Sequence, residues 1–276
     1  MSSLRIAGIE SAKLKLARVA VHLDEIRHLI SESTRKTDAY EIIKDANGKE
    51  TVNFLLGPPQ DLFVIVGEIV YQFRSALDHL AFQLIESNQA QIALPGDWER
   101  HCKFPLMLNV PATGNPPVPF ILPVPQSVFE KTLPGMSKTA YAFIESVQPY
   151  HRGPGIHNVL RIIGQLANID RHKHFHVMIP RLAVHSYVAY SGGITGTHTV
   201  GGLKHGAEVP LFPAFPNIQE GTAVNVYRTF SPYVTFDAET IGVGPDTLES
   251  ENVLEVCLQQ FESVIIPTFD KLLQNS

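Results

Sequence analysis

Hydrophobic residues near the start of the chain recur with the period of a long amphipathic helix. Apolar positions spaced seven apart, and those between them, form one seam: Ile9, Ala12, Leu16, Val19, Leu23, Ile26 and Ile30. This coiled-coil-like spacing predicts a helix over about residues 4–33.

A second apolar seam begins after Pro58 and Pro59, and proline is tolerated in the first turn of a helix. Its residues step by three and four: Phe63, Val66, Val70, Phe73, Leu77, Leu80 and Leu84. Between the seams, Ala39–Leu56 holds two β-leaning runs around Asn47-Gly48, a hairpin signal because both turn positions need positive φ. The two helices should therefore pack antiparallel in a bundle.

Prolines then interrupt regular structure. Phe104–Pro125 contains seven prolines, which excludes a helix or central strand there. Because the stretch is also apolar, we expect an extended segment laid over the core. A short helix over Ser137–Val147 follows, and Pro154 opens another helix.

After His174 the hydrophobic period changes to that of strands. Four runs rich in Val, Tyr, Phe and Thr follow: Phe175–Ile179, Ala183–Tyr190, Ala223–Phe230 and Tyr233–Phe236. They predict an antiparallel sheet of roughly four to six strands. Gly192-Gly193 and Gly201-Gly202 indicate hairpin turns. Glu249–Gln274 closes the chain as a helix with a kink at Pro267.

The order of helices, strands and a returning helix predicts an α+β fold. We expect a long-helix antiparallel bundle with a β-hairpin and an inserted antiparallel sheet before the C-terminal helix. Residues 1–276 should form a single domain, with the bundle at about 4–174 plus 249–274 and the β insertion at about 175–240.

Composition limits the class of protein. With 44% hydrophobic and 18% charged residues the chain should fold, and its net charge of −5 lacks the basic footprint of a nucleic-acid binder. Cys102 and Cys257 form no CxxC, which argues against a disulfide framework or thiolate zinc site. No secretory signal is visible, and the longest apolar stretch, Leu62–Val70, is too short to span a bilayer. We therefore expect a cytoplasmic protein that does not interact with membranes.

Two polar clusters interrupt the helical seams. The first is Arg74-Ser75-Ala76-Leu77-Asp78-His79 and the second is Asn168-Ile169-Asp170-Arg171-His172-Lys173-His174. Charges on a core-facing stripe are costly unless partnered, so the clusters predict a polar site.

Helical geometry sorts the first cluster. Around a stripe centred on Leu77, Arg74 lies about 60° and Asp78 about 100° to one side, while His79 lies about 160° the other way. Arg74 and Asp78 are four apart and can pair. We expect both to border the core and His79 to leave it.

The second cluster places a carboxylate on the core stripe. Asp170 lies about 20° from Ile163, and His174 falls on the same line if the helix continues. His172 and Asn168 point away. A buried Asp170 needs a cation, a metal or several donors, and His174 and Arg74 are the candidate partners.

These residues predict a site built on Arg74, Asp78, Asp170 and His174, with His79, His172 and His176 as secondary candidates. In the main hypothesis it binds a small polar or anionic ligand, because Arg74 offers a bidentate donor. Two structural alternatives stay open: a buried network that only fixes helix register, and a polar cap with a salt bridge at a helix end, where the chain leaves the core and meets water.

A metal site is a further hypothesis, because Asp170 and His174 share a helix face and Asp78, His79 or His176 could add ligands. No HExxH motif, nucleophile elbow or nucleotide loop is present. The sequence therefore assigns no metal ligand and no catalytic residue, and leaves enzyme activity and any cofactor open.

The spacing Arg74-x4-His79 in a helical bundle resembles the Rx4-6H signature of the HEPN superfamily. The resemblance implies metal-independent RNA cleavage, with Arg and His positioning the 2′-hydroxyl and the scissile phosphate. Because the two residues lie about 140° apart on the helix, a joint site would need a dimer or a second element.

The segments Phe73–Ala81 and Asn168–His172 also resemble segments of uncharacterised bacterial proteins of similar length. This resemblance implies one architecture that carries both segments, and no activity. The long heptad seams are in addition compatible with a homodimer.

Overall fold

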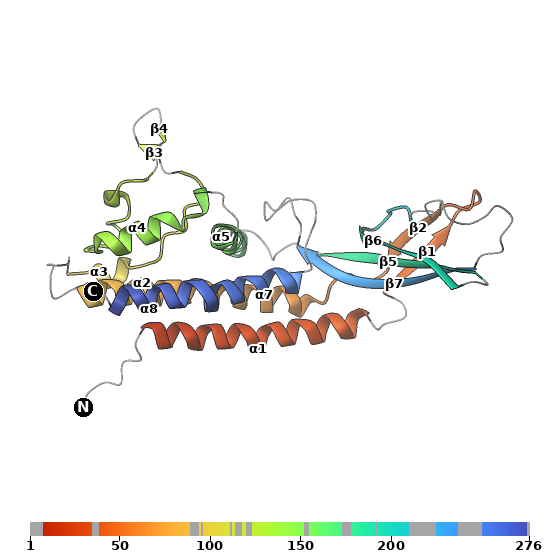
Figure 1. Ribbon diagram of the computed structural model, residues 1–276, viewed down its shortest axis with the longest axis horizontal. Helices are drawn as coiled ribbons and strands as arrows, with labels where there is room; N and C mark the ends of the chain where they lie inside the picture. The colour runs from red at the N-terminus through yellow and green to blue at the C-terminus, as the bar shows by residue number, and fades with distance from the viewer. Residues whose placement is uncertain are drawn as a thin grey trace. The chain divides into compact units, whose positions relative to one another are not determined.

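The computed structural model describes residues 8–34, 39–88, 94, 96–110, 112–113, 118–119, 123–151, 155–172, 178–190, 193–209, 225–236 and 250–274. The chain divides into two compact units, drawn in Figure 1. We call them the helical unit (Met1–Glu25, Val64–His176 and Glu251–Ser276) and the strand unit (Ile26–Phe63 and Val177–Ser250). A single domain over the whole chain stays a prediction. Within the described ranges no helix is long and apolar enough to span a bilayer.

The predicted α+β fold class is confirmed. A helical bundle, a β-hairpin and an antiparallel sheet inserted before the C-terminal helix follow one another along the chain. The long helices are α1 (Gly8–Thr34), α2 (Gln60–Asn88) and the C-terminal run of α7 (Ser250–Gln260), η4 (Phe261–Ile265) and α8 (Ile266–Gln274).

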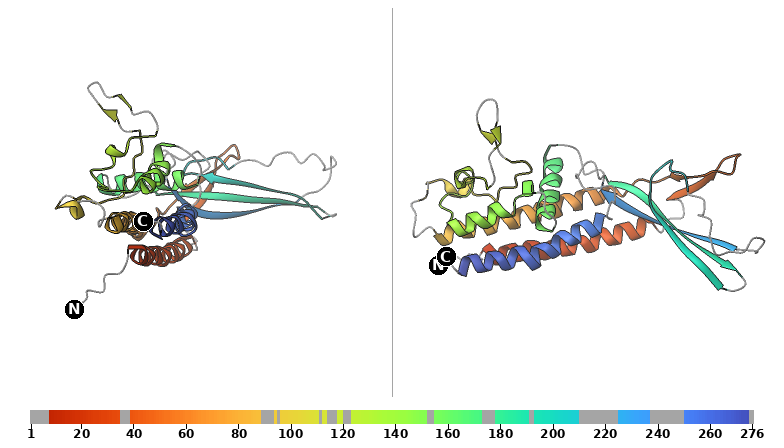
Figure 2. Two further views of the ribbon diagram at one scale, coloured as in Figure 1. Left: turned by 60° about the vertical axis from the view of Figure 1, so that its left-hand side comes forward. Right: turned by 45° about the horizontal axis from the view of Figure 1, so that its top comes forward.

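Within the helical unit these long helices lie side by side (Figures 1 and 2). The two predicted seams face the core there, since these positions are buried: Ile9, Ala12, Leu16, Val19, Leu23, Val66, Val70, Phe73, Leu77, Leu80 and Leu84. Burial of the two apolar stripes is what makes such helices stable, because helical propensity alone is weak.

Aromatic rings tie the shorter elements of the helical unit to the C-terminal helix. Phe269 of α8 is fully buried, and its ring centroid lies 6.3 Å from that of Phe104 and 5.4 Å from that of Phe143. Phe104 begins the proline-rich segment and Phe143 belongs to α4 (Lys138–Ser146). The expectation that this segment covers the core therefore holds at Phe104.

The remaining elements of the helical unit are short, apart from α5. They are α3 (Trp98–His101), β3 (Ala112–Thr113), β4 (Val118–Pro119), η2 (Gln126–Val128), η3 (Pro149–His151) and α5 (Ile156–His172). In Figure 1, α5 is seen nearly end-on and runs across the long helices. Its residue Gly164 packs closely, because a Cβ there would lie 3.2 Å from Cδ2 of Leu108.

The C-terminal helix is irregular just before the predicted kink. The π-turn η4 precedes Pro267, and the Ile266 N–H bonds to the carbonyl of Phe261, five residues back. Such a bulge shifts the helical hydrogen-bond ladder, and Pro267 then lies in the first turn of α8, where a missing N–H costs little.

The strand unit contains a three-stranded antiparallel sheet and the hairpin. Strand order is β6 (Gly193–Leu203), β5 (Met178–Tyr190), β7 (Asn225–Phe236). The predicted hairpin is confirmed: β1 (Tyr40–Lys44) pairs with β2 (Glu50–Phe54), and Gly48 has φ 81° in the turn. Their shared core is Val52, Leu182, Val184 and Val209.

Two predicted strand breaks are wrong. Strand β5 runs through Pro180, because β6 pairs with it only from Leu182 onward and leaves that side of Pro180 without a ladder. Strand β7 likewise runs through Pro232, because it lies at the edge of the sheet. Edge positions tolerate a residue that has no N–H to donate.

The turn predicted at Gly201-Gly202 is also wrong, because both glycines lie inside β6. The ladder shifts register there: Leu182 pairs with Leu203, but Val184 pairs with Val200. One extra β6 residue is accommodated as a bulge, which glycine permits. Of the other predicted turn, Gly193 pairs with Tyr190 at the start of β6, and Gly192 lies outside the described residues.

We predict that Phe269→Ala lowers the free energy of unfolding by about 3–5 kcal/mol, because it empties the space between Phe104 and Phe143. Urea unfolding followed by circular dichroism measures the loss. Val256→Ala on the same C-terminal helical run is the control, because Val256 is 44% exposed and should change stability by less than about 0.5 kcal/mol. Similar losses in both variants would contradict this account of the core.

Candidate functional site

One turn of α2 holds both backbone groups of Phe104. Asp78 Oδ1 accepts the Phe104 N–H at 2.8 Å, and Arg74 Nη2 donates to the Phe104 carbonyl at 3.2 Å. The same Arg74 nitrogen lies 3.8 Å from Asp78 Oδ1, so the predicted pairing of the two side chains is confirmed. We call this arrangement of Arg74, Asp78 and Phe104 the α2 clamp.

Partial burial sets the electrostatics of the clamp. Removal from water raises the pKa of Asp78, while Arg74 and the Phe104 N–H act in the opposite direction. Burial, and secondarily the charge of Asp78, raises the pKa of the nearby Cys102 thiol to about 12. Cys102 is therefore protonated at neutral pH and does not supply a thiolate nucleophile.

A pocket of about 180 Å³ adjoins the clamp. Its lining includes Arg74, Lys103 and Asn168, which have polar side chains, and Leu106, Gly164 and Ala167. Phe104 and Pro105 also line it, and none of the described lining residues has a carboxylate. The arrangement is a small cleft with two cationic side chains at an apolar wall.

The second polar cluster differs from its prediction. Asp170 is exposed, not buried on the apolar stripe, because it lies in the last turn of α5, where the helix leaves the core. Its Oδ1 lies 3.0 Å from where a Cβ on Gly67 would stand. Asn168, which we expected to point away, is the residue of this cluster that lines the pocket with Arg74.

The candidate histidines separate into different places. His79 Nδ1 lies 2.7 Å from the hydroxyl of Ser11 on α1, and Nε2 lies 3.5 Å from that of Ser75. Burial, and then Lys15, lowers the pKa of His79. His172 ends α5, and His174 and His176 lie outside the described residues, so their roles stay predictions.

The positions of these side chains bear on two hypotheses, the HEPN-like ribonuclease and the metal site. Arg74 bonds to Phe104, whereas His79 lies within hydrogen-bond distance of Ser11, so the two side chains engage different partners, and the HEPN resemblance stays a prediction. Across the described parts of the chain, no three His, Cys, Asp or Glu side chains are grouped to hold a metal ion.

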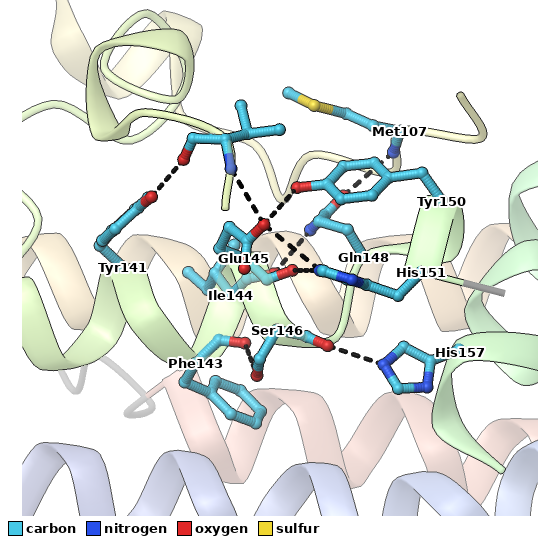
Figure 3. A network of polar contacts seen from close by, with 11 residues as sticks. Met107, Tyr141, Phe143, Ile144, Glu145, Ser146, Gln148, Tyr150, His151 and His157 are labelled. Carbon is cyan, nitrogen blue, oxygen red and sulfur yellow. Dashed lines mark hydrogen bonds and ion pairs between the residues drawn. The ribbon is translucent and has the colours of Figure 1, made fainter. Parts of the chain in front are cut away.

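Sequence reasoning missed a buried network around Glu145 of α4 (Figure 3). The side chain is 7% exposed, and its Oε1 accepts the Val124 N–H at 3.1 Å and the Tyr150 hydroxyl at 3.0 Å. His151 Nε2 lies 3.3 Å from the same oxygen, and the Tyr141 hydroxyl donates to the Val124 carbonyl. Val124 is thus held at both backbone groups, in what we call the α4 clamp (Tyr141, Glu145 and Val124).

A sequence signal for the α4 clamp does exist. Tyr141 and Glu145 are four residues apart, the same spacing as Arg74 and Asp78, and each pair combines a donor with a carboxylate. On a nine-residue helix, however, an acidic residue ordinarily indicates the solvent face. Burial together with the Glu145 hydrogen bond raises the pKa of Tyr150, which keeps that phenol a donor.

Comparison of the chain with family models, with curated proteins and with solved structures finds no match in any of the three.

We predict that Asp78→Ala lowers the free energy of unfolding by about 1–3 kcal/mol, because the Phe104 N–H loses its acceptor. Asp78→Asn should cost less, since its amide oxygen can still accept that N–H. Urea unfolding of the two variants beside the wild type measures the difference. Equal losses would mean that the hydrogen bond to Phe104 contributes nothing to stability.

The raised pKa of Asp78 predicts a pH dependence of stability. The folded state holds the Asp78 proton more tightly than the unfolded state, so this stabilisation is complete below the unfolded pKa and is lost as pH rises through the folded pKa. Between about pH 4 and pH 7, the unfolding free energy of the wild type should therefore fall relative to that of Asp78→Asn as the pH rises. A rise of the wild-type value relative to the variant would show that the pKa of Asp78 is lowered in the folded state. Glu99→Gln on α3 is the control.

Proposed function

We propose that this protein binds a small anionic ligand, bearing a carboxylate or a phosphate, in the pocket beside the α2 clamp. The observation that carries the proposal is the lining of the pocket, where the described residues include Arg74, Lys103 and Asn168 and no Asp or Glu. Arginine binds planar oxyanions through two parallel hydrogen bonds, and lysine adds a compact point charge.

Pre-organisation supports this proposal. Arg74 is held by the Phe104 carbonyl and by Asp78, and only 18% of its side chain is exposed. A guanidinium fixed before the ligand arrives loses little conformational entropy on binding. Nearby apolar atoms of Leu106 and Ala167 lower the local dielectric and so strengthen attraction to an anion.

Charge balance also favours an anion. Asp78 stands beside Arg74 at 3.8 Å and offsets part of its charge, but Lys103 leaves the group of three with a net charge of +1 when all are ionised. Lys103 is exposed, and no part of the α2 clamp is built from its side chain. A substitution at Lys103 should therefore change ligand binding without changing the structural role of the clamp.

The test is isothermal titration calorimetry with inorganic phosphate and with succinate. We predict that at least one binds the wild type and that Lys103→Ala weakens it about tenfold, the value of one charge-assisted hydrogen bond. Thermal melting of Lys103→Ala should match the wild type.

Lys131→Ala is the matched control, since Lys131 is an exposed lysine of the same unit that does not line the pocket. It should bind as the wild type does. Absence of binding by both anions, or equal affinity in the Lys103 and Lys131 variants, would refute an anion site here.

A further inference from the structure

The strand unit contains a second pocket, of about 200 Å³. It lies where Ser33 of α1, the end of β2 with the following turn to Pro59, and strands β5 and β7 meet. The lining residues belong entirely to the strand unit, so this pocket is separate from the one beside Arg74.

Most of the described residues that line this pocket are apolar. Phe54, Leu56, Pro180 and Val234 line it, together with Pro58 and Pro59. Among the described lining residues there is no Asp, Glu, Lys, Arg or His. An ion would therefore lose hydration against this part of the wall without gaining a charged partner from it.

Two polar groups near the wall are bonded within the protein. The Ser33 hydroxyl donates to the Ile30 carbonyl at 2.9 Å. The Ala39 carbonyl accepts the N–H groups of Leu55 at 3.0 Å and Leu56 at 3.4 Å. Tyr233 adds a phenol to the lining, but most of the described lining side chains are apolar, so apolar contact is the main attraction that they offer.

The pocket is built on rigid supports. Phe54 packs against the strand-unit core of Val52, Leu182, Val184 and Val209. Pro180 and Val234 are held opposite each other in the β5–β7 ladder. Proline rings fix their own backbone φ, so Pro58 and Pro59 stiffen the remaining side.

Size then selects the ligand. A 150 Å³ cavity lined by Leu, Ile and Phe is known to stay dry and to bind benzene. A pocket of about 200 Å³ accommodates one aromatic ring with a small substituent. We propose that this pocket binds small uncharged aromatic molecules, through apolar contact with Phe54, Leu56 and the surrounding prolines.

Saturation-transfer difference NMR with toluene and with benzoate tests this proposal. The two probes have nearly the same shape and differ in charge, so toluene should receive saturation in this pocket and benzoate should not compete with it. Benzoate that binds only at the Arg74 pocket is recognised because Lys103→Ala weakens its signal and leaves that of toluene unchanged. Failure of the anion site therefore leaves this result intact.

Gly57→Leu is the blocking variant. Gly57 lines the pocket, and a Cβ there would meet nothing within 4 Å, so the leucine can enter open space without distorting the fold. The toluene signal should disappear. Gly96→Leu is the control, because Gly96 has equally open surroundings and lies in the helical unit.

Leu56→Ser is a second variant that does not depend on filling the pocket. Leu56 is 41% exposed, so the fold should survive the change, while loss of its apolar contact should weaken toluene binding about threefold or more. Three results would overturn the proposal. They are the absence of a toluene signal in the wild type, displacement of toluene by benzoate, and unchanged toluene binding in folded Gly57→Leu or Leu56→Ser.

Discussion

The helical unit depends on side-chain hydrogen bonds to the backbone of its proline-rich segment, Phe104–Pro125. Between Phe104 and Pro125, seven residues lack a backbone N–H, and in its described part the short β3–β4 pair is the one ladder that satisfies backbone groups. Buried backbone groups left without partners are costly. Phe104 and Val124, near its two ends, are both buried, and side chains of α2 and α4 bond their N–H and carbonyl groups.

The two clamps use one geometry. A donor and a carboxylate stand four residues apart on a helix, which places them side by side within reach of the N–H and the carbonyl of one extended residue. The α2 clamp also fixes Lys103, Pro105 and Leu106 against α5, and so forms one wall of the pocket. The candidate ligand site is thus a consequence of how the segment is secured.

Sequence periodicity predicted what depends on local repetition. The two apolar seams, the hairpin at Gly48 and the pairing of Arg74 with Asp78 follow from spacing alone. Periodicity did not decide the burial of Asp170, because a helical wheel gives the direction of a side chain and not where the helix leaves the core. The exposed Asp170 agrees with the alternative of a polar helix end. Glu145 was missed because its partner, Val124, is distant in sequence and adjacent only after folding.

Proline and glycine were misinterpreted in the strands for a related reason. Pro180 and Pro232 indicate breaks only if both sides of the strand carry ladder hydrogen bonds, and strand order is not visible in the sequence. The glycine pair at 201–202 indicates a turn or a bulge equally well, and the register against β5 decides between them.

A comparison of the two clamps clarifies why the α2 site is the better candidate for binding. At Val124 the phenol of Tyr141, a neutral group, is a sufficient donor to the carbonyl. At Phe104 the donor is a guanidinium, whose positive charge exceeds what one carbonyl requires and is costly to bury unless it is compensated. Asp78 compensates part of it, yet Lys103 adds a second cation at the same pocket. Securing the segment accounts for the donor and the acceptor but not for the second cation, Lys103, and this cation is what the proposed anionic ligand would pair with.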